Sequence, residues 1–263
     1  MIKVAIHGAA GRMGQRLVAL AAADKELQVV AAVESEKHPR LGEDAGSVAG
    51  VRQLGVQLSS ALTVPIDVVI DFSVPTGAET ILQSCLRQKI PLVIATTGFD
   101  ARQKALIQKS AETIPLLWSP SMSLAVNLAM KLAAVAGTAL ADDPSGVDVE
   151  IIERHHRFKE DAPSGTALKF GEIIAGVMGQ TGQAHGRSGR PGERPHGEIG
   201  YHAVRTGDNP GEHTIIFGML GETLEIAVRA SNRDCYAHGA LAAAKFLTGK
   251  PAGLYGIQDV LGL

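Results

Sequence analysis

The first residues of the chain constrain its fold more than any other stretch. A β-branched run from Ile2 to His7 is followed by the glycine turn 8–14 (GAAGRMG) and then by apolar residues at helical spacing. A dinucleotide-binding turn needs one glycine for a tight bend, one for the approach of a pyrophosphate and one for packing helix against strand. The spacing here, G-x-x-G-x-x-G, is a variant of the usual G-x-G-x-x-G and alone is a weak indication.

The next strand strengthens this interpretation. It runs from Leu27 to Val33 and ends at Glu34, about 20 residues past the turn, where an acid can bind ribose hydroxyls. Strand, turn, helix, strand and acid together predict a dinucleotide site, and the alternative is an α/β turn without a ligand. The predicted contacts are Gly8, Ala9, Ala10, Gly11, Arg12, Met13 and Glu34.

The residue after Glu34 bears on which nicotinamide dinucleotide is used. A pocket that prefers NADP tends to place an arginine beside the acid to pair with the 2′-phosphate, but Ser35 stands here. Lys37, His38 and Arg40 are close enough in sequence to substitute. We therefore expect NADH or NADPH as the cofactor, with NADH or dual use favoured.

Buried strands alternate with helices through the first half of the chain. Strand patterns at 67–72, 91–95 and 114–118 predict an α/β fold with a Rossmann-type, doubly wound parallel sheet. Ligands of such sheets bind outside the carboxyl ends of the strands, so residues there are expected to border the nicotinamide. The alternative for each is an ordinary polar turn. These residues are Phe72, Ala95, Thr96, Thr97, Ser119, Pro120, Ser121 and Met122.

The pattern changes after Met122, and it predicts a second α+β domain with a mixed sheet. The expected helices are 123–140 and 165–178, and the expected strands are 147–153, 198–205, 211–220 and 223–230. The glycine-rich segment 179–197 is typical of a mobile loop rather than packed structure.

The alanine-rich tail resembles the first half of the chain again, which predicts a discontinuous domain. We expect residues 1–126 and 235–263 to form the dinucleotide-binding domain and residues 127–234 to form the substrate-binding domain. The hinges are expected near Val126 and Asp234.

A cationic stretch at 150–168 (EIIERHHRFKEDAPSGTAL) is the strongest candidate for chemistry. His155, His156, Arg157 and Lys159 fall within five residues. Neighbouring cations repel one another and add little to a core, so a compact domain carries them for a ligand or in a solvated loop. In an extended segment adjacent side chains point to opposite sides, so one of the two histidines can be structural.

The end of this stretch has the pattern of a helix start. Ser164 is a good N-cap, and the free amides of Gly165 and Thr166 at the positive end of a helix dipole form a site for a carboxylate. Cations and an anion-binding helix start together indicate an acidic substrate. The alternative is a charged surface loop that Ser164 caps.

Composition narrows the classes of partner. A net charge of −2 gives no overall attraction for nucleic acid or for an anionic membrane. Two cysteines, Cys85 and Cys235, lie far apart without a partner motif, which argues against a disulfide scaffold and favours a reducing, cytoplasmic location. Metal binding is not expected, because no third ligand of suitable spacing accompanies the two histidines.

Three motifs carry a resemblance to a known family. They are GAAGRMG at 8–14, ATTGF at 95–99 and, most specific, E-x-HH-x-x-K-x-DAPSGTA at 153–167. In this order they resemble the 4-hydroxy-tetrahydrodipicolinate reductases (dihydrodipicolinate reductases) of bacterial lysine and diaminopimelate synthesis. The resemblance implies hydride transfer from NADH or NADPH to a cyclic dicarboxylate, and an oligomerisation role for domain 127–234, whose sheet builds a homotetramer.

The resemblance also implies roles for single residues. It assigns His155 as proton donor or acceptor and Lys159 as proton donor. It assigns the binding of substrate carboxylates to His156, Gly165 and Thr166, with Arg233 as a further contributor.

The sequence departs from the family pattern at four positions. Ser121 and Met122 stand where asparagine and phenylalanine are frequent, Ala95 replaces a common glycine, and Ser35 occupies a position where some members have arginine.

Two other classes of protein remain as alternatives. One is another two-domain dehydrogenase of the homoserine or semialdehyde type, although no candidate catalytic cysteine lies beside a strand end. The other is a regulatory module that binds NADH without turning a substrate over, which would not need the histidine and lysine cluster.

Overall fold

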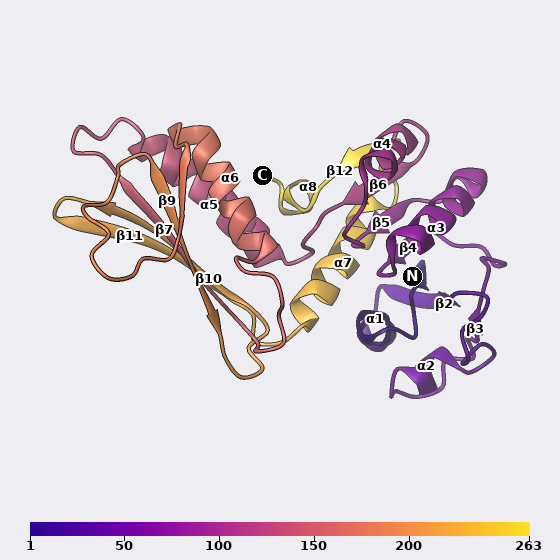
Figure 1. Ribbon diagram of the computed structural model, residues 1–263. Helices are drawn as coiled ribbons and strands as arrows, with labels where there is room; N and C mark the ends of the chain where they lie inside the picture. Colours follow the sequence, from indigo (N-terminus) through magenta and orange to yellow (C-terminus); the bar gives the residue numbers. More distant parts are fainter. The chain divides into compact units, whose positions relative to one another are not determined.

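The computed structural model describes all 263 residues and divides the chain into two compact units. One unit joins Met1–Leu124 to Arg233–Leu263, and the other is the continuous segment Ala125–Asn232. Figure 1 shows the chain passing out of the first unit and returning to it through the long helix α7 (Asp234–Leu247). The sequence prediction set the two limits at residues 126 and 235.

The first unit is built on a sheet of seven parallel strands in the order β12-β6-β5-β4-β1-β2-β3. The strands are β1 Ile2–His7, β2 Leu27–Val33, β3 Leu58–Ser59, β4 Val68–Asp71, β5 Leu92–Ile94, β6 Pro115–Trp118 and β12 Gly253–Tyr255. This order confirms the predicted doubly wound sheet. Strands β3 and β12, at the two edges, were not predicted.

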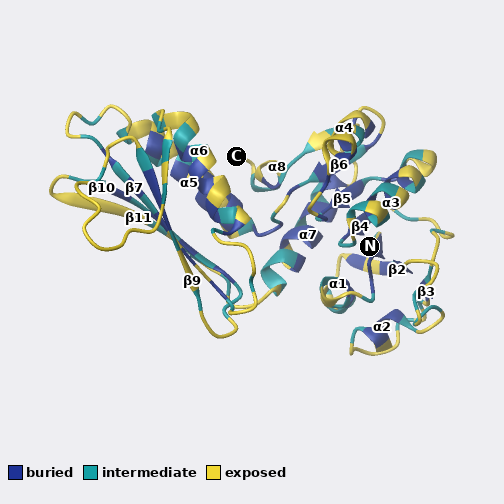
Figure 2. Ribbon diagram, viewed as in Figure 1, coloured by how far each residue is buried: buried dark blue, intermediate teal, exposed yellow.

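Helices cover both faces of this sheet, so its strands are largely buried (Figure 2). Along β1, Val4 and Ile6 pack into one apolar cluster and Ala5 into the other, as expected when successive side chains of a strand point to opposite faces. Helices α1 (Arg12–Ala23) and α7 (Asp234–Leu247) contribute to the first cluster. Helices α3 (Pro75–Gln88) and α4 (Ala101–Ser110) contribute to the second.

The C-terminal tail completes the first unit. Helix α7 packs against α1 and strands β4 to β6, and the short helix α8 (Ile257–Leu261) packs on α7. Both oxygens of Asp234 at the start of α7 accept hydrogen bonds from Arg16 of α1, at 2.7 and 2.8 Å. The tail is therefore part of the core of this unit. The other short helix, α2 (Ala45–Val48), was not predicted.

The second unit is a five-stranded mixed sheet in the order β11-β10-β7-β9-β8, which confirms the predicted sheet type. The strands are β7 Asp148–His155, β8 Gly182–His185, β9 Glu198–Arg205, β10 Glu212–Met219 and β11 Glu222–Arg229. Helices α5 (Leu124–Leu140) and α6 (Gly165–Met178) pack on one face of the sheet. Alternate residues of β7 are buried on that face, so Val149, Ile151, Glu153 and His155 share it.

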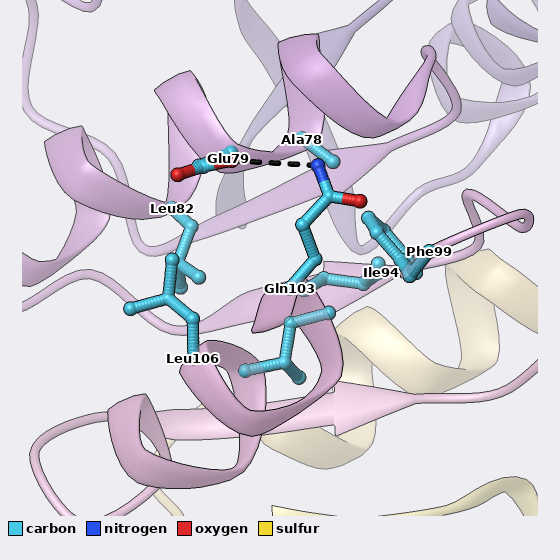
Figure 3. Close-up of a pocket in the computed structure, with 8 residues that line it drawn as sticks. Ala78, Glu79, Leu82, Ile94, Phe99, Gln103 and Leu106 are labelled. Atoms are coloured by element: carbon cyan, nitrogen blue, oxygen red, sulfur yellow. Dashed lines mark hydrogen bonds between the residues drawn. The ribbon is translucent and has the colours of Figure 1, made fainter. Parts of the chain in front are cut away.

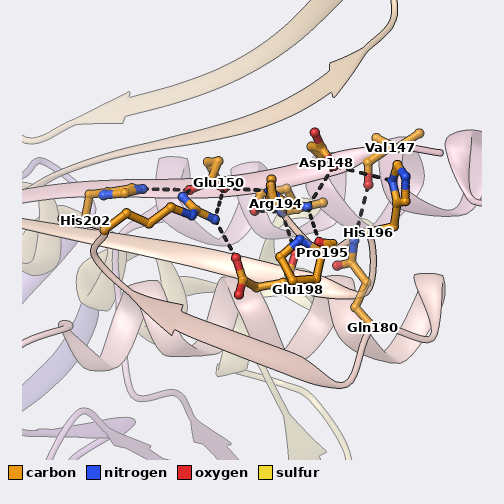
Figure 4. Close-up of polar contacts among 11 residues, drawn as sticks. Val147, Asp148, Glu150, Gln180, Arg194, Pro195, His196, Glu198 and His202 are labelled. Atoms are coloured by element: carbon orange, nitrogen blue, oxygen red, sulfur yellow. Dashed lines mark hydrogen bonds and ion pairs between the residues drawn. The ribbon is translucent and has the colours of Figure 1, made fainter. Parts of the chain in front are cut away.

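The prediction of a mobile loop at 179–197 was wrong in part. Residues Gly182–His185 form β8, which pairs in parallel with β9. Arg194 then donates hydrogen bonds to Glu150, to Asp148 and to the backbone of β7, as Figure 4 shows. These partners lie more than 40 residues away in sequence, so the composition of the segment alone did not reveal them.

The helices fall short of the length and apolar character that a membrane-spanning helix requires.

The packing of α7 predicts the effect of one substitution. A Cβ atom added at Gly239 would lie 1.7 Å from the backbone oxygen of Met122, so Gly239→Ala should lower the free energy of unfolding by about 1–3 kcal/mol. At the exposed Gly176 of α6 nothing lies within 4 Å, and Gly176→Ala should be neutral or stabilising by about 0.5–1 kcal/mol. Urea denaturation measures both, and equal effects would contradict the packing of α7.

Candidate functional site

One row of residues marks the carboxyl edge of the parallel sheet. His7 of β1 is in register with Val33 of β2 and Asp71 of β4, and Asp71 continues the row to Ile94 of β5 and Trp118 of β6. Each predicted cofactor contact follows one of these strand ends. From β1 the chain builds β2 and β3 on one side and then crosses to β4 on the other side, so this edge holds the topological switch point at which such sheets bind ligands.

The turn after β1 is shaped for a close approach of backbone. Gly8 has φ of 76°, which favours glycine, and a Cβ there would lie 2.5 Å from the carbonyl oxygen of Phe72. A Cβ at Gly14 would lie 2.0 Å from the carbonyl oxygen of Gly8. No side chain caps the start of α1, so its first-turn amides are open to a phosphate. This turn therefore fits a dinucleotide.

Glu34 lies where the sequence places it, directly after β2. One carboxylate oxygen accepts a hydrogen bond from the amide of Ala10 at 2.8 Å, which holds the acid against the glycine turn. Ser35 beside it is exposed. The guanidinium of Arg40 donates to Glu43 at 2.8 and 3.0 Å, so its charge already has a partner within this loop.

A buried carboxylate organises the ends of β1, β4 and β5. Asp71 is fully buried and accepts hydrogen bonds at 2.6 Å from the hydroxyls of Thr96 and Ser73, and its carboxylate lies 2.6 Å from Nδ1 of His7. The amide of Ser73 in turn donates to Thr96 at 3.0 Å. The hydroxyl of Thr96 is therefore committed to this network, and only its backbone remains for a cofactor.

The remaining predicted cofactor residues differ in exposure. Met122 is buried in the core of the unit, whereas Thr97 and Pro120 are exposed. Phe72, Ala95 and Ser121 are half-buried, and the hydroxyl of the buried Ser119 donates to the carbonyl of Ser121 at 2.7 Å.

A recess between α3 and α4 is lined in part by Ile94, the last residue of β5. Figure 3 shows its lining, where Gln103 donates a hydrogen bond to Glu79 beside the side chains of Leu82 and Phe99. None of the predicted site residues lines it.

In the second unit, His155 is the last residue of β7 and is buried. Its Nδ1 lies 2.5 Å from a carboxylate oxygen of Glu153, two residues earlier on the same face. Burial lowers the pKa of His155, while the hydrogen bond with Glu153 acts in the opposite direction. The imidazole is therefore mainly neutral near pH 7.

Glu153 is itself buried and has three groups of partners. Arg205 of β9 donates to both carboxylate oxygens, at 2.7 and 2.8 Å, and the amide of Ser164 donates at 3.0 Å. Burial by itself would raise the pKa of Glu153, but the hydrogen bonds from Arg205 and His155 hold it below its ordinary value. An ionised carboxylate thus joins the end of β7 to the start of α6.

The loop between β7 and α6 is also connected to Glu153. Nζ of Lys159 donates to both carboxylate oxygens of Asp161, at 2.7 and 2.9 Å, and this contact lowers the pKa of Asp161. The guanidinium of Arg205 also donates to the backbone carbonyl of Asp161 at 2.7 Å. One arginine therefore connects Glu153 with the loop that carries Lys159.

The start of α6 has the predicted cap. The hydroxyl of Ser164 accepts a hydrogen bond from the amide of Ala167 at 3.1 Å. The amides of Gly165 and Thr166 precede it in the first turn, where the helix offers no partner, so they can bind an anion.

Two predicted contributors have less defined surroundings. His156 is half-buried beside the exposed ring of Phe158, and its Nδ1 has no hydrogen-bond partner. Arg233 belongs to the other compact unit, where it directly precedes α7.

Sequence reasoning missed three side chains of this site: Glu153 as a partner of His155, Arg205 and His213. His213 of β10 is buried, and its ring packs edge-on to that of His155 with 5.2 Å between the ring centroids. Its Nε2 lies 3.0 Å from the hydroxyl of Ser164. Only the position of Glu153 in the motif signalled a role. Arg205 and His213 come from strands about 50 residues away and carry no local pattern.

Comparison with known proteins gives the same family over both halves of the chain. Residues 2–122 match the model described as dihydrodipicolinate reductase, N-terminus, and residues 125–261 match that for its C-terminus. The 4-hydroxy-tetrahydrodipicolinate reductase of Rhodopirellula baltica is 55% identical and is covered over 96% of its length by the whole of this chain. That of Syntrophotalea carbinolica is 45% identical over the whole of both chains.

Solved structures agree with these relatives. A dipicolinate-bound dihydrodipicolinate reductase from Paenisporosarcina sp. TG-14 superposes with a TM-score of 0.79 and 29% identity, covering 98% of this chain and 99% of that one. An amine dehydrogenase from Mycobacterium smegmatis, with a TM-score of 0.65 and 14% identity, covers 97% of this chain and 95% of that one. This second likeness shows the fold alone.

The environment of His213 predicts a dependence of stability on pH. Burial lowers its pKa to about 4, whereas a histidine in the unfolded chain has a pKa of about 6.5. Between these values the unfolded state takes up a proton that the folded state excludes, so stability falls as the pH drops. From pH 6.5 to pH 5 the free energy of unfolding should fall by roughly 1.5 kcal/mol more than in His213→Asn.

Urea denaturation at both pH values tests this expectation. The asparagine keeps an acceptor for the hydroxyl of Ser164 but does not titrate, and at pH 5 and above most carboxylates stay ionised. If the free energy of unfolding changes equally with pH in the two proteins, His213 is accessible to protons in the folded state.

Proposed function

The chain belongs to the dihydrodipicolinate reductase family, and from this membership and the geometry of the two units we propose how its residues divide the reaction. It reduces 4-hydroxy-tetrahydrodipicolinate to tetrahydrodipicolinate in diaminopimelate and lysine biosynthesis, with a nicotinamide dinucleotide as reductant. The observation that carries the division of roles is the cluster around Glu153, which ties a histidine, a lysine loop and an anion-binding helix start together.

The first unit holds the dinucleotide. The open amides at the start of α1 bind the pyrophosphate, and Glu34 binds the ribose. The backbone at the ends of β4, β5 and β6 borders the nicotinamide, which supplies the hydride when the dinucleotide is bound.

The second unit holds the cyclic dicarboxylate. The amides of Gly165 and Thr166 bind one carboxylate at the start of α6, and His156 contributes a further contact. The solved relative that carries dipicolinate, itself a cyclic dicarboxylate, supports this assignment.

Lys159 and His155 carry out the protonation of the ring. Hydride addition leaves negative charge on the ring, and a positioned acid must neutralise it. Lys159 is a primary ammonium on a loop held by Asp161, so it serves as the donor. Lys159 is left as an amine when it has given its proton to the ring. His155 is mainly neutral near pH 7, so it takes up a proton from solvent at its free nitrogen and returns it to that amine.

The surroundings of Glu34 support NADH or dual use of both dinucleotides. An acid on the ribose disfavours a 2′-phosphate, and Arg40 is already engaged with Glu43. Lys37 remains as a cation that a 2′-phosphate can recruit.

A homotetramer with a cytoplasmic location completes the proposal. The face of the second sheet away from α5 and α6 exposes Ile152 and Val204, which supports burial of that face between copies. Light scattering should then give four times the 27.5 kDa mass of the chain.

The reaction is tested by consumption of NADH and NADPH by the pure protein, with substrate made in situ from pyruvate and aspartate semialdehyde by its synthase. Rapid consumption supports the proposal, and the ratio of kcat/KM for the two dinucleotides measures the effect of Ser35. Tight binding of NADH without consumption would instead favour a sensing module.

Two substitutions separate the roles in the second unit. Lys159→Ala should lower kcat by roughly 10²-fold or more, because it removes the general acid. His156→Ala should mainly raise KM for the dicarboxylate, because it removes a binding contact. Near-normal turnover of the first variant would exclude Lys159 as the donor, and an unchanged KM of the second would exclude His156 from binding.

A further inference from the structure

Strand β7 carries two clusters of a glutamate, a histidine and arginine, one on each face. On the face away from the helices, Glu150 contacts Nε2 of His202 at 2.6 Å and accepts a hydrogen bond from Arg194 (Figure 4). Arg187 also donates to Glu150. Both arginines hold the 186–197 segment to the sheet. On the helix face, Glu153 contacts His155 through the other ring nitrogen, Nδ1. Only the second cluster lies among the proposed catalytic residues.

We propose that Glu153 is a positioning residue that fixes His155 as the Nδ1–H tautomer, and that Arg205 keeps Glu153 in place as a carboxylate for this purpose. The inference rests on the proposed role of His155. The proton of catalysis then enters and leaves His155 at Nε2 alone.

The hydrogen-bond pattern around Glu153 determines the tautomer. Arg205 and the amide of Ser164 can only donate, so the carboxylate accepts from both. An ionised carboxylate is an acceptor only, so the contact of 2.5 Å to His155 requires a proton on Nδ1. A neutral imidazole then carries its lone pair on Nε2.

The hydroxyl of Ser164 excludes His213 as a hydrogen-bond partner of His155. It accepts from the amide of Ala167, and its single proton is therefore directed to Nε2 of His213. His213 is thus an acceptor at Nε2 and packs against the ring of His155 without sharing a proton with it. Glu153 remains as the polar partner of His155.

Arg205 accounts for how a carboxylate can stay ionised when buried. A buried carboxylate without a partner takes up a proton, and a protonated Glu153 could no longer hold Nδ1–H with a full charge. The guanidinium compensates the charge with two hydrogen bonds and also fixes the carbonyl of Asp161. The same side chain therefore orients the histidine and the lysine loop.

Burial lowers the pKa of His155, and the charges that face the ring act in addition to it. Glu153 on β7 favours the imidazolium, whereas Arg205 on β9, Lys159 on the loop and His213 on β10 disfavour it. Removal of the carboxylate charge alone leaves the opposing groups unbalanced. In Glu153→Gln the pKa of His155 should therefore fall by about one unit or more.

The tautomer is measured directly by long-range ¹⁵N–¹H NMR of protein labelled in histidine, with the signals of His155 assigned through His155→Asn. The unsubstituted protein should show a protonated Nδ1 and an unprotonated Nε2. In Glu153→Gln the pKa of His155 read from the same spectra should fall. The limb of the pH–kcat profile that belongs to His155 should move to lower pH by the same amount.

Steady-state kinetics separates positioning from a structural effect. Glu153→Gln has nearly the same shape and should lower kcat roughly 10²-fold, while KM for NADH stays within about twofold, because the dinucleotide binds the other unit. Glu150→Gln is the matched control, since it removes the same charge from the same strand beside a histidine and two arginines. It should leave the tautomer and the pKa of His155 unchanged, and it should leave kcat of the enzyme unchanged.

The outcomes are distinct. The inference is overturned if the neutral ring of His155 carries its proton on Nε2. It is also overturned if the Glu153→Gln enzyme keeps the pH profile of the unsubstituted one, even if reduction is rapid. If the unsubstituted protein consumes neither dinucleotide, the proposed function fails, while the spectra still decide whether Glu153 sets the tautomer.

Discussion

The buried charge of Glu153 is the constraint on which the second unit depends. A carboxylate without water is unfavourable unless hydrogen bonds and an opposite charge compensate it. The fold supplies both from three separate elements: Arg205 from β9, the amide of Ser164 at the start of α6 and His155 at the end of β7. Satisfying one charge thereby sets the relative positions of the groups that the reaction uses.

Sequence patterns predicted the sheet types and most element limits because these depend on short-range periodicity. Helix α6 occupies Gly165–Met178 as expected, since Ser164 caps it and Gly179 ends it with φ of 71°. The glycine turn and Glu34 were located for the same reason. The roles of the glycine turn and Glu34 came from their pattern, those of His155, His156 and Lys159 came from the resemblance to a family, and all of them remain predictions.

What the sequence could not supply lies in contacts between distant segments. Arg205 and His213 occupy ordinary alternating strands, and their functional surroundings appear only when β9 and β10 flank β7. The glycine-rich segment was misjudged as mobile because its anchors, Arg187 and Arg194, pair with Glu150 across the sheet. The short edge strand β12 has too few residues to produce a periodic signal.

The return of the chain to its first unit has a consequence for synthesis on the ribosome. Much of the apolar layer on one face of the seven-stranded sheet comes from α7, with Ala240, Ala244 and Leu247 fully buried there. Until those residues leave the exit tunnel, α1 is the main helix that covers that face, while the continuous segment Ala125–Asn232 is already complete. The order of completion is therefore the reverse of the usual N-terminal-first order, and the unfinished nucleotide-binding half is the part that chaperones must shield.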